Sequence, residues 1–111
     1  LRVDKYLASR LSQTLTLDRI CRDNLVGRSR LQQIFHAETG GGVMEYFGRR
    51  KIEAAKEMIR REDGNFTEIA TRLGYQSIYY FSRHFKKVTG MTPSEYASGV
   101  RALAARNKPG E

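Results

Sequence analysis

The sequence predicts an all-α protein that contains two copies of a helix-turn-helix unit joined by a long helix. Apolar residues recur at helical spacing along the chain, and no segment alternates convincingly with a period of two. The chain also repeats itself after about 50 residues. Its length of 111 residues is that of about one domain.

The first half of the chain divides into three short helical segments. Their apolar positions are, in order, Val3, Tyr6, Leu7 and Leu11; Leu17, Ile20 and Cys21; and Leu31, Ile34 and Phe35. The third segment should end at Thr39-Gly40, because glycine readily takes the left-handed conformation that terminates many helices. We expect residues of about 3–42 to form the first helix-turn-helix subdomain, with Leu31, Ile34 and Phe35 facing its core.

Residues 43–61 form the longest helical segment and are predicted to link the two copies. Apolar residues follow helical spacing there, at Met44, Phe47, Ile52, Ala55, Met58 and Ile59. The stretch REDGNF at 61–66 is typical of a loop. We therefore expect a linker helix over 43–61, a second helix-turn-helix subdomain over 62–106, and a tail over 107–111.

The second half repeats the first with a shift of one residue. Six pairs lie 50 positions apart (Leu31 and Phe81, Phe35 and Phe85, Thr39 and Thr89, Gly40 and Gly90, Glu45 and Glu95, Tyr46 and Tyr96), whereas Ile20 and Ile69, and Cys21 and Ala70, lie 49 apart. One extra residue in the second turn would explain the difference. Each copy contains a short helix, a tight turn, a longer helix and Thr-Gly, as expected for a helix-turn-helix.

A helical wheel also predicts the inner face of the longer helix in the second helix-turn-helix copy. Phe81, Phe85 and Val88 should point to the core, with Ile78 near them. A further helix should open at Thr92-Pro93-Ser94-Glu95, because this sequence is a capping box with proline at the first helical position.

The charge indicates a polyanionic partner. The chain has 20 Lys and Arg against 12 Asp and Glu, a net charge of +8 and an isoelectric point near 10.0. Nucleic acid and anionic membranes are the first candidates for such a partner.

The chain lacks the signals of a membrane-spanning or secreted protein. No run of 18 apolar residues occurs, and the charged start LRVDKYLASRL lacks a signal sequence's apolar core. We expect a cytoplasmic, nucleoid-associated protein that neither crosses nor binds a membrane, and a fragment of a longer chain because it begins at Leu1.

The outward faces of the two longer helices carry base-reading chemistry. Winding each helix at 100° per residue places Ser29, Gln33 and His36 outward with Arg30 and Gln32 on the flanks, and in the second copy Tyr79, Arg83 and Lys86 outward with Tyr80 and Ser82 on the flanks. Glutamine suits adenine, arginine suits guanine, and a tyrosine ring can contact a thymine methyl group. One such face is usually only solvated surface, but two in the same frame favour recognition.

Contacts to the DNA backbone are expected from polar and basic residues around these faces. They are Arg28, Arg30, His36, Arg49, Arg50, Ser77, Lys86, Lys87 and Thr92. Cys21 corresponds to Ala70 and is predicted to be a buried small residue. His36 and His84 have no companion at metal-ligand spacing, so we expect no metal and no cofactor. No nucleophile elbow, phosphate-binding glycine loop or carboxylate pair is found, which argues against an enzyme.

The stretch IATRLGYQSIYYFSRHFKKVTGMTPSEY resembles the signature of the AraC/XylS family of bacterial transcription regulators, and LQQIFHAETGGGVMEYFGRRKIEAAKEMI resembles the first helix-turn-helix and linker helix that precede it. The resemblance covers roughly residues 3–105. It implies seven helices in two homeodomain-like subdomains, with the third and sixth helices in adjacent major grooves. It assigns base reading to Ser29, Gln32, Gln33, Ile78, Tyr79, Tyr80, Ser82 and Arg83; only the resemblance supports Ile78.

The sequence departs from the family pattern at four places. Gly27 stands where Ser or Thr is frequent, Leu25 where the turn often has Gly, and Lys51 where the linker helix usually has Arg. The run GGG at 40–42 is unusually flexible. We expect weaker capping of the first recognition helix as a result.

The sequence therefore favours the DNA-binding domain of a transcription regulator, more often an activator in such families. The resemblance favours an N-terminal effector or dimerisation domain before Leu1, through which any small-molecule effector would act, although some members of the family consist of this domain alone. Double-stranded DNA is the expected partner. A basic protein-interaction module that docks on RNA polymerase or another acidic partner is the alternative, and an RNA-binding protein ranks lower, because single-strand readers usually present aromatic residues on sheets.

Overall fold

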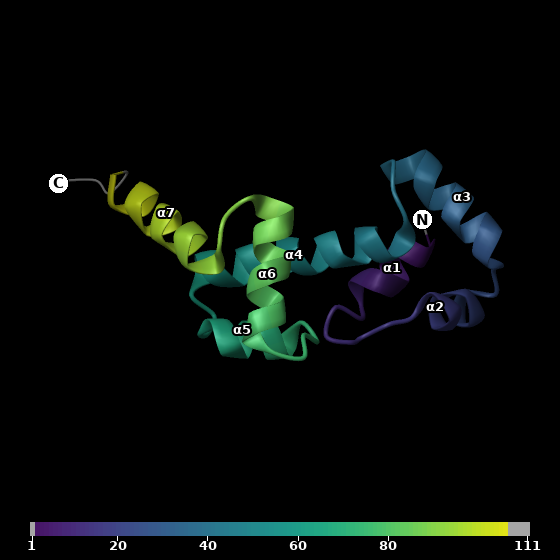
Figure 1. Ribbon diagram of the computed structural model, residues 1–111, viewed down its shortest axis with the longest axis horizontal. Helices are drawn as coiled ribbons and strands as arrows, with labels where there is room; N and C mark the ends of the chain where they lie inside the picture. The colour runs from purple at the N-terminus through teal and green to yellow at the C-terminus, as the bar shows by residue number, and fades with distance from the viewer. Residues whose placement is uncertain (1, 107–111) are drawn as a thin grey trace. The chain divides into compact units, whose positions relative to one another are not determined.

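The computed structural model describes residues 2–106, and this part of the chain contains seven α-helices and no strand (Figure 1). The helices are α1 (Arg2–Ala8), α2 (Leu17–Asn24), α3 (Arg28–Thr39), α4 (Val43–Arg61), α5 (Phe66–Arg72), α6 (Ile78–Thr89) and α7 (Pro93–Arg106). The predicted all-α fold is confirmed. The tail expected at 107–111 lies outside the described residues.

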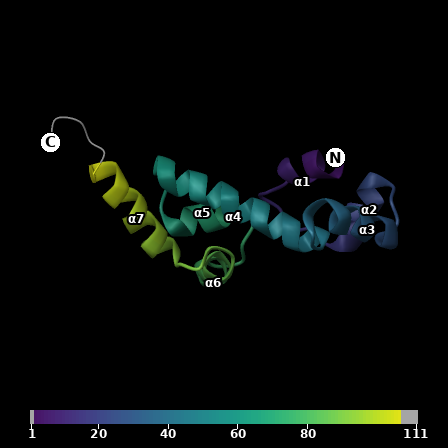
Figure 2. The same cartoon turned by 90° about the horizontal axis from the view of Figure 1, so that it is seen from above.

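The chain divides into two compact units, Leu1–Lys51 and Ile52–Glu111, so that α4 contributes its two halves to different units. Figure 2 shows α4 as one continuous helix. The subdomain limits expected from the sequence follow the ends of α4 and stay a prediction.

The first unit has a small core that draws on all four of its helical segments. Its buried residues are Leu7, Leu15, Ile20, Cys21, Leu31, Phe35, Val43 and Phe47. Leu31 and Phe35 lie on the inner face of α3 as predicted, and Ile34 is half-buried beside them. Cys21 is buried, in agreement with its expected role as a small apolar residue.

The core of the second unit is more aromatic. Tyr75 packs edge-on against Phe81 with 5.3 Å between ring centroids, Phe81 against Phe85 at 5.8 Å, and Phe85 against Tyr96 at 5.6 Å. Phe81 and Phe85 are fully buried, which confirms their predicted orientation. Such edge-to-face pairs contribute about 0.5 to 1.5 kcal/mol each beyond the area that they bury.

The prediction that Val88 lies in the core is wrong. Val88 is 38% exposed, although it winds to the same side of α6 as Phe85. A helical wheel gives the direction of a side chain but not whether a neighbouring element covers it, and Val88 lies in the last turn of α6 just ahead of Gly90. Ile78, expected near the core, is likewise 38% exposed in the first turn.

The helix ends follow the expected chemistry. Gly40 and Gly90 cap α3 and α6 in the left-handed conformation, with φ of 80° and 85°. Thr92 and Glu95 form the predicted capping box, in which the Thr92 amide donates to Glu95 Oε1 at 2.8 Å and the Glu95 amide to Thr92 Oγ1 at 3.1 Å. A second capping box at the start of α5, between Asn65 and Glu68, was not predicted.

The internal repeat is visible in the helix bounds. Helix α5 begins 49 residues after α2, and α6 begins 50 residues after α3, so the extra residue lies in the second turn as predicted. Each turn contains one residue with positive φ: Leu25 (54°) in the first and Gly74 (76°) in the second. These two occupy equivalent places.

Candidate nucleic-acid interface

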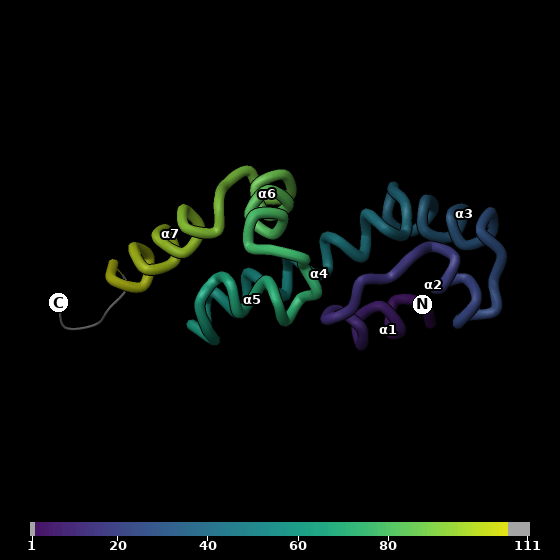
Figure 3. The backbone as a smooth tube through the Cα atoms, turned by 60° about the horizontal axis from the view of Figure 1, so that its bottom comes forward, coloured from purple at the N-terminus to yellow at the C-terminus, as the bar shows by residue number. Residues whose placement is uncertain are grey.

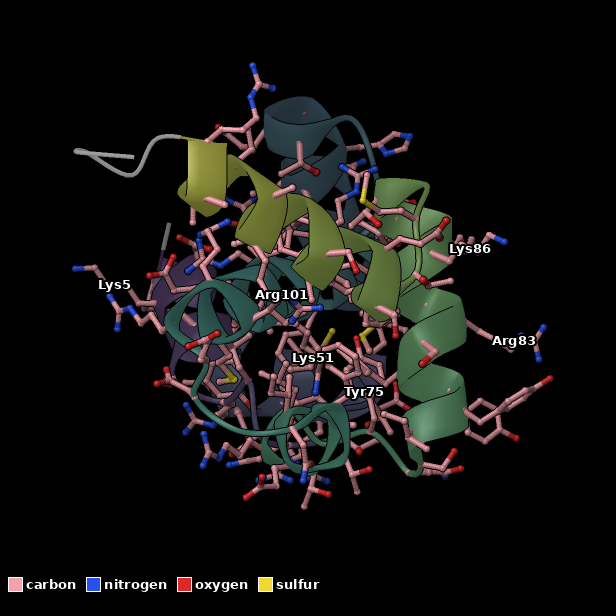
Figure 4. All side chains as sticks on the ribbon, turned by 90° about the vertical axis from the view of Figure 1, so that its left-hand side faces the viewer. Lys5, Lys51, Tyr75, Arg83, Lys86 and Arg101 are labelled. Carbon is pink, nitrogen blue, oxygen red and sulfur yellow. The ribbon has the colours of Figure 1, made fainter. Side chains whose placement is uncertain are left out.

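Helix α6 presents a wide outward face of aromatic and basic side chains. Tyr79 is 62% exposed and Tyr80 54%, and Arg83 and Lys86 are also exposed. Figure 4 shows Arg83 and Lys86 projecting away from α6, while Tyr75 lies on the inner side. The structure thus brings together the outward residues that the wheel predicted, with Ile78 at the start of the face and half-buried Ser82 at its edge.

Three of these side chains hold one another in place. The Tyr79 and Tyr80 ring centroids are 5.8 Å apart with the rings inclined at 73°, and the Arg83 guanidinium carbon lies 5.4 Å from the Tyr79 centroid. A cation over an exposed aromatic ring is stabilised by about 0.5 to 1 kcal/mol. The ring therefore restricts the orientation of the Arg83 donors, which is what a bidentate contact with guanine requires.

Two residues of the turn before α6, Ser77 and Tyr75, form hydrogen bonds with the helix. Ser77 Oγ accepts a hydrogen bond from the Tyr80 amide at 3.3 Å, and the Tyr75 hydroxyl lies 2.7 Å from His84 Nδ1. Burial raises the pKa of the Tyr75 hydroxyl above its ordinary value. The sequence did not reveal that Tyr75 and His84 pair, and two rings with polar tips nine residues apart were the only available signal.

Helix α3 presents a more polar outward face with a weaker start. Ser29, Gln32, Gln33 and His36 are all exposed, as is Arg30. Gly27 occupies the N-cap position and offers no side-chain hydrogen bond, whereas Ser77 caps the equivalent position of α6. The weaker capping expected for the first recognition helix is therefore present.

Gln32 has a structural role that the sequence did not indicate. Its Oε1 accepts a hydrogen bond from the Val43 amide at 3.3 Å, at the first residue of α4. Gly42 precedes that helix and cannot cap it with a side chain, whereas Thr92 caps α7 in the second copy. This bond occupies one of the two acceptor positions of Oε1 and restricts how Gln32 can present its oxygen and nitrogen to a base.

Several residues expected to contact the DNA backbone are paired within the protein. Arg28 binds Asp18, with Nη2 2.7 Å from Oδ1; Arg49 pairs with Glu45 one turn earlier on α4, and Arg50 lies 3.9 Å from Asp4. Exposed ion pairs are worth at most about 1 kcal/mol, so these arginines can exchange their partners for phosphates.

The other members of the expected backbone set lie at helix ends. Lys86 and Lys87 are exposed in the last turn of α6, Ser77 and Thr92 cap α6 and α7, and Arg30 and His36 lie on α3. Cations at these ends add to the positive charge around the two outward faces.

Lys51, in the middle of α4, is the one charged residue that is buried within residues 2–106. Only 8% of the residue is exposed, and Nζ donates to the carbonyl oxygens of Leu11 and Gln13 at 3.0 and 2.7 Å. Nζ also lies 4.8 Å from the Phe47 ring centroid. Burial lowers the pKa of Lys51 to about 8. This lysine therefore ties the segment between α1 and α2 to α4 and is not available to bind DNA.

Within residues 2–106, no group of three or more His, Cys, Asp or Glu is placed to hold a metal ion. None of the helices in that stretch combines the length and the apolar character needed to cross a membrane.

Comparison with known families and sequences gives consistent matches. The family described as "Helix-turn-helix domain" matches residues 20–99. The MmsAB operon regulatory protein of Pseudomonas aeruginosa is 31% identical over 96 residues, which cover 86% of this chain and 31% of that protein. The HTH-type transcriptional activator RhaR of Yersinia pseudotuberculosis is 32% identical over 92 residues, covering 80% of this chain and 32% of the relative. The chain thus spans about a third of the length of these curated relatives.

Solved structures share the fold. The C-terminal domain of AraT, a response regulator from Geobacillus stearothermophilus, superimposes with a TM-score of 0.82 at 29% identity, covering 88% of this chain and 82% of that one. The DNA-binding domain of the global transcriptional factor AdpA, determined with a target DNA, gives 0.83 at 20% identity over 98% of this chain and 96% of its own, a likeness of fold alone.

Proposed function

The chain belongs to the AraC/XylS family of helix-turn-helix regulators, and from this we propose that it binds double-stranded DNA in a sequence-specific manner as part of a bacterial transcription regulator. We propose that the regulator acts in the cytoplasm, at promoter DNA. We also propose that it is an activator, because the relative RhaR is named a transcriptional activator.

The observation that carries this proposal is the pair of outward faces on α3 and α6. The two helices have the same length of 12 residues, begin 50 residues apart and end at equivalent Thr-Gly pairs. Each buries two apolar residues at the same positions, Leu31 and Phe35 in one and Phe81 and Phe85 in the other. A recognition helix needs this combination, because one face must anchor it while the other remains free for base edges.

We assign different tasks to the two faces. On α6, Arg83 would read guanine, with Ile78, Tyr79, Tyr80 and Ser82 contacting neighbouring base edges. On α3, Ser29 and Gln33 would read bases freely, and Gln32 would do so within the limits that its contact with Val43 sets. The basic residues around both faces would supply affinity without sequence preference.

The first test is selection of binding sites from a random pool of double-stranded DNA at two salt concentrations. We expect enrichment of an asymmetric site with two short elements, and affinity that falls steeply as salt rises. Tight binding without any selected sequence would contradict the proposal, since a basic surface alone binds in that way.

The second step assigns the elements to the helices. Arg83→Ala should weaken binding to the selected site by about 1 to 3 kcal/mol and relax the preference at one or two bases. Arg61→Ala is the matched control, because Arg61 pairs with Glu57 on α4 and lies on neither recognition helix. An equal loss on every sequence would mean that Arg83 contacts only phosphate.

A further inference from the structure

An apolar groove lies on the second unit, between the last turn of α4 and helix α7. Met91 and Leu103 are large apolar residues of its lining, Gly99 and Ala102 are small ones, and Arg60 and Arg106 add two guanidinium groups. Leu103 is 57% exposed and Met91 39%. The groove has a volume of about 680 Å³, within the range that holds a ligand or several side chains.

The second half of α7 has no covering element in the described structure. Ala97 is the last buried residue of α7, Val100 is half-buried, and residues 101–106 are all exposed. Figure 3 shows these last turns extending beyond α5 and α6. A single exposed leucine is ordinary, but here Leu103 shares one groove with Met91, Val100 and Ala102, and a contiguous apolar patch is less common on a protein surface.

In the internal repeat, two exposed alanines of α7 correspond to buried residues of α4, whereas Leu103 corresponds to the exposed Glu53. Ala102 and Ala105 lie 50 positions after Ile52 and Ala55 of α4. Those two residues have no exposed surface, because the second half of α4 packs into the core of the second unit. The same positions of α7 are exposed. The repeat thus has a packed face in α4 and an unpacked one in α7.

The charges at the groove favour an acidic partner. Arg60 Nη1 donates to the Tyr96 hydroxyl at 2.6 Å and Nη2 to Glu57 Oε2 at 2.5 Å, which holds the guanidinium at the edge of the groove. Arg106 lies in the last turn of α7. Both charged residues in the described lining are arginines, and none is a carboxylate. Carboxylates on a partner would complement Arg106, and they would add to the Glu57 carboxylate that Arg60 already binds.

We propose that this groove docks an amphipathic helix of a partner protein. The apolar stripe of that helix would pack between Met91 and Leu103, and acidic residues beside the stripe would pair with Arg60 and Arg106. A helix suits the groove because nothing lies within 4 Å of the place where a Cβ of Gly99 would stand, so a backbone can approach closely. The apolar lining does not suit DNA, whose protein interfaces are polar.

The inference does not rest on the proposed DNA binding, since the groove shares no residue with the outward faces of α3 and α6. Its test uses a synthetic 15-residue helical peptide with leucines at positions 1, 4, 8 and 11, flanking glutamates, and alanines elsewhere. A second peptide has lysine in place of each glutamate. Each is titrated into the isotope-labelled chain, and amide chemical shifts are followed.

We expect the glutamate peptide to shift the signals of α7 and of the last turn of α4, with a Kd of about 10 to 100 μM, and the lysine peptide to bind at least about tenfold more weakly. Shifts confined to α3 and the outward face of α6 would overturn the proposal, since they would report attraction to a basic surface. Equal binding of the two peptides would also overturn it.

Matched leucine variants locate the contact. Leu103→Asp should weaken the glutamate peptide by about tenfold, whereas Leu25→Asp, which changes an even more exposed leucine in the first unit, should leave it unchanged. Arg106→Glu should shift the preference toward the lysine peptide. Thermal melting checks that each variant folds. Equal losses for both leucine variants would contradict docking at this groove.

Discussion

Leu25 occupies a place in the first turn that suits glycine. Its φ of 54° and ψ of 48° lie in the left-handed region, and the residue is 91% exposed, so its side chain gains little from burial. A left-handed conformation costs a residue with a Cβ roughly 1 to 2 kcal/mol. At the equivalent place in the second turn the chain has Gly74, with a φ of 76°.

Replacing Leu25 by glycine should therefore stabilise the protein. We expect Leu25→Gly to raise the free energy of unfolding by about 0.5 to 1 kcal/mol, less than the full strain because glycine also gives the unfolded chain more freedom. Denaturant unfolding measures the change. Leu25→Ala is the control, since alanine removes the exposed side chain but keeps the strain. A gain with alanine as large as that with glycine would show that strain is not the cause.

Lys51 should make stability depend on pH in the alkaline range. Burial lowers its pKa to about 8 from an ordinary value of 10.5, so between these two pH values the unfolded chain binds more protons than the folded one. Stability then rises with pH across that window, because folding no longer has to bury the charge. The contribution reaches at most about 3 kcal/mol.

The difference between the native chain and Lys51→Met isolates this effect from other groups that titrate near pH 10. We expect the native chain to exceed the methionine variant in unfolding free energy by the largest margin above pH 10. This margin should shrink as the pH falls to 8 and below. Urea unfolding at half-unit steps of pH measures it. A difference that stays constant between pH 8 and 10.5 would mean that the lysine titrates as in the unfolded chain.

Among the elements, α3 and α6 differ most at their starts. Gly27 gives α3 no side-chain cap, whereas Ser77 Oγ accepts from the Tyr80 amide at the start of α6. Gly27 has a φ of −76°, and nothing lies within 4 Å of the place of its Cβ, so a serine fits there. We expect Gly27→Ser to stabilise the protein by a few tenths of a kcal/mol, and Ser77→Ala to destabilise it by about 1 kcal/mol.

Hydrogen exchange distinguishes a cap from a general change in stability. Amides in the first turn of α3 should gain protection in Gly27→Ser but not in Gly27→Ala, which has the same backbone constraint without the hydroxyl. If the alanine variant protects those amides equally, the gain comes from the unfolded chain and not from capping.

The same elements show what the sequence could and could not predict. Helix starts and ends were predictable at Thr92, Gly40 and Gly90, because their signals are local. The exposure of Val88 and Ile78, 38% each, was not predictable, since it depends on which neighbours reach the ends of α6. The contact of Gln32 with Val43 joins residues 11 positions apart across a turn, and no local pattern announces it.

The candidate site divides in the same way. Winding α3 and α6 around Phe35 and Phe85 was enough to place Gln33 and Arg83 outward, because the apolar face determines the opposite one. The position of the Arg83 guanidinium over the Tyr79 ring and the pair of Tyr75 with His84 depend on rotamers and on packing, which the sequence does not specify. Which of the outward residues touch bases stays a prediction.

At the scale of the whole molecule, the chain has two small cores that share one helix. Phe35 and Phe85 are fully buried in the first and second unit and occupy equivalent places. Phe85→Ala should lower the free energy of unfolding by about 3 to 5 kcal/mol, because it removes a large buried ring and leaves a cavity. An unchanged melting temperature would contradict this core assignment.

Both units include part of α4, and we predict that this connection restricts the spacing of the two DNA elements. The helix has 19 residues and is about 28 Å long, close to the roughly 34 Å between successive major-groove faces on one side of B-DNA. We expect insertion of five base pairs between the two elements of a selected site to abolish the contribution of one element, because the insertion turns it to the far side of the duplex. Ten base pairs should not restore it, since a helix cannot stretch by a further turn of DNA.

Binding measured on the three spacings tests this, with Arg83→Ala as the control that should respond less to spacing because its second contact is already weakened. Recovery at ten base pairs would mean that the two units are joined flexibly and read the two elements independently.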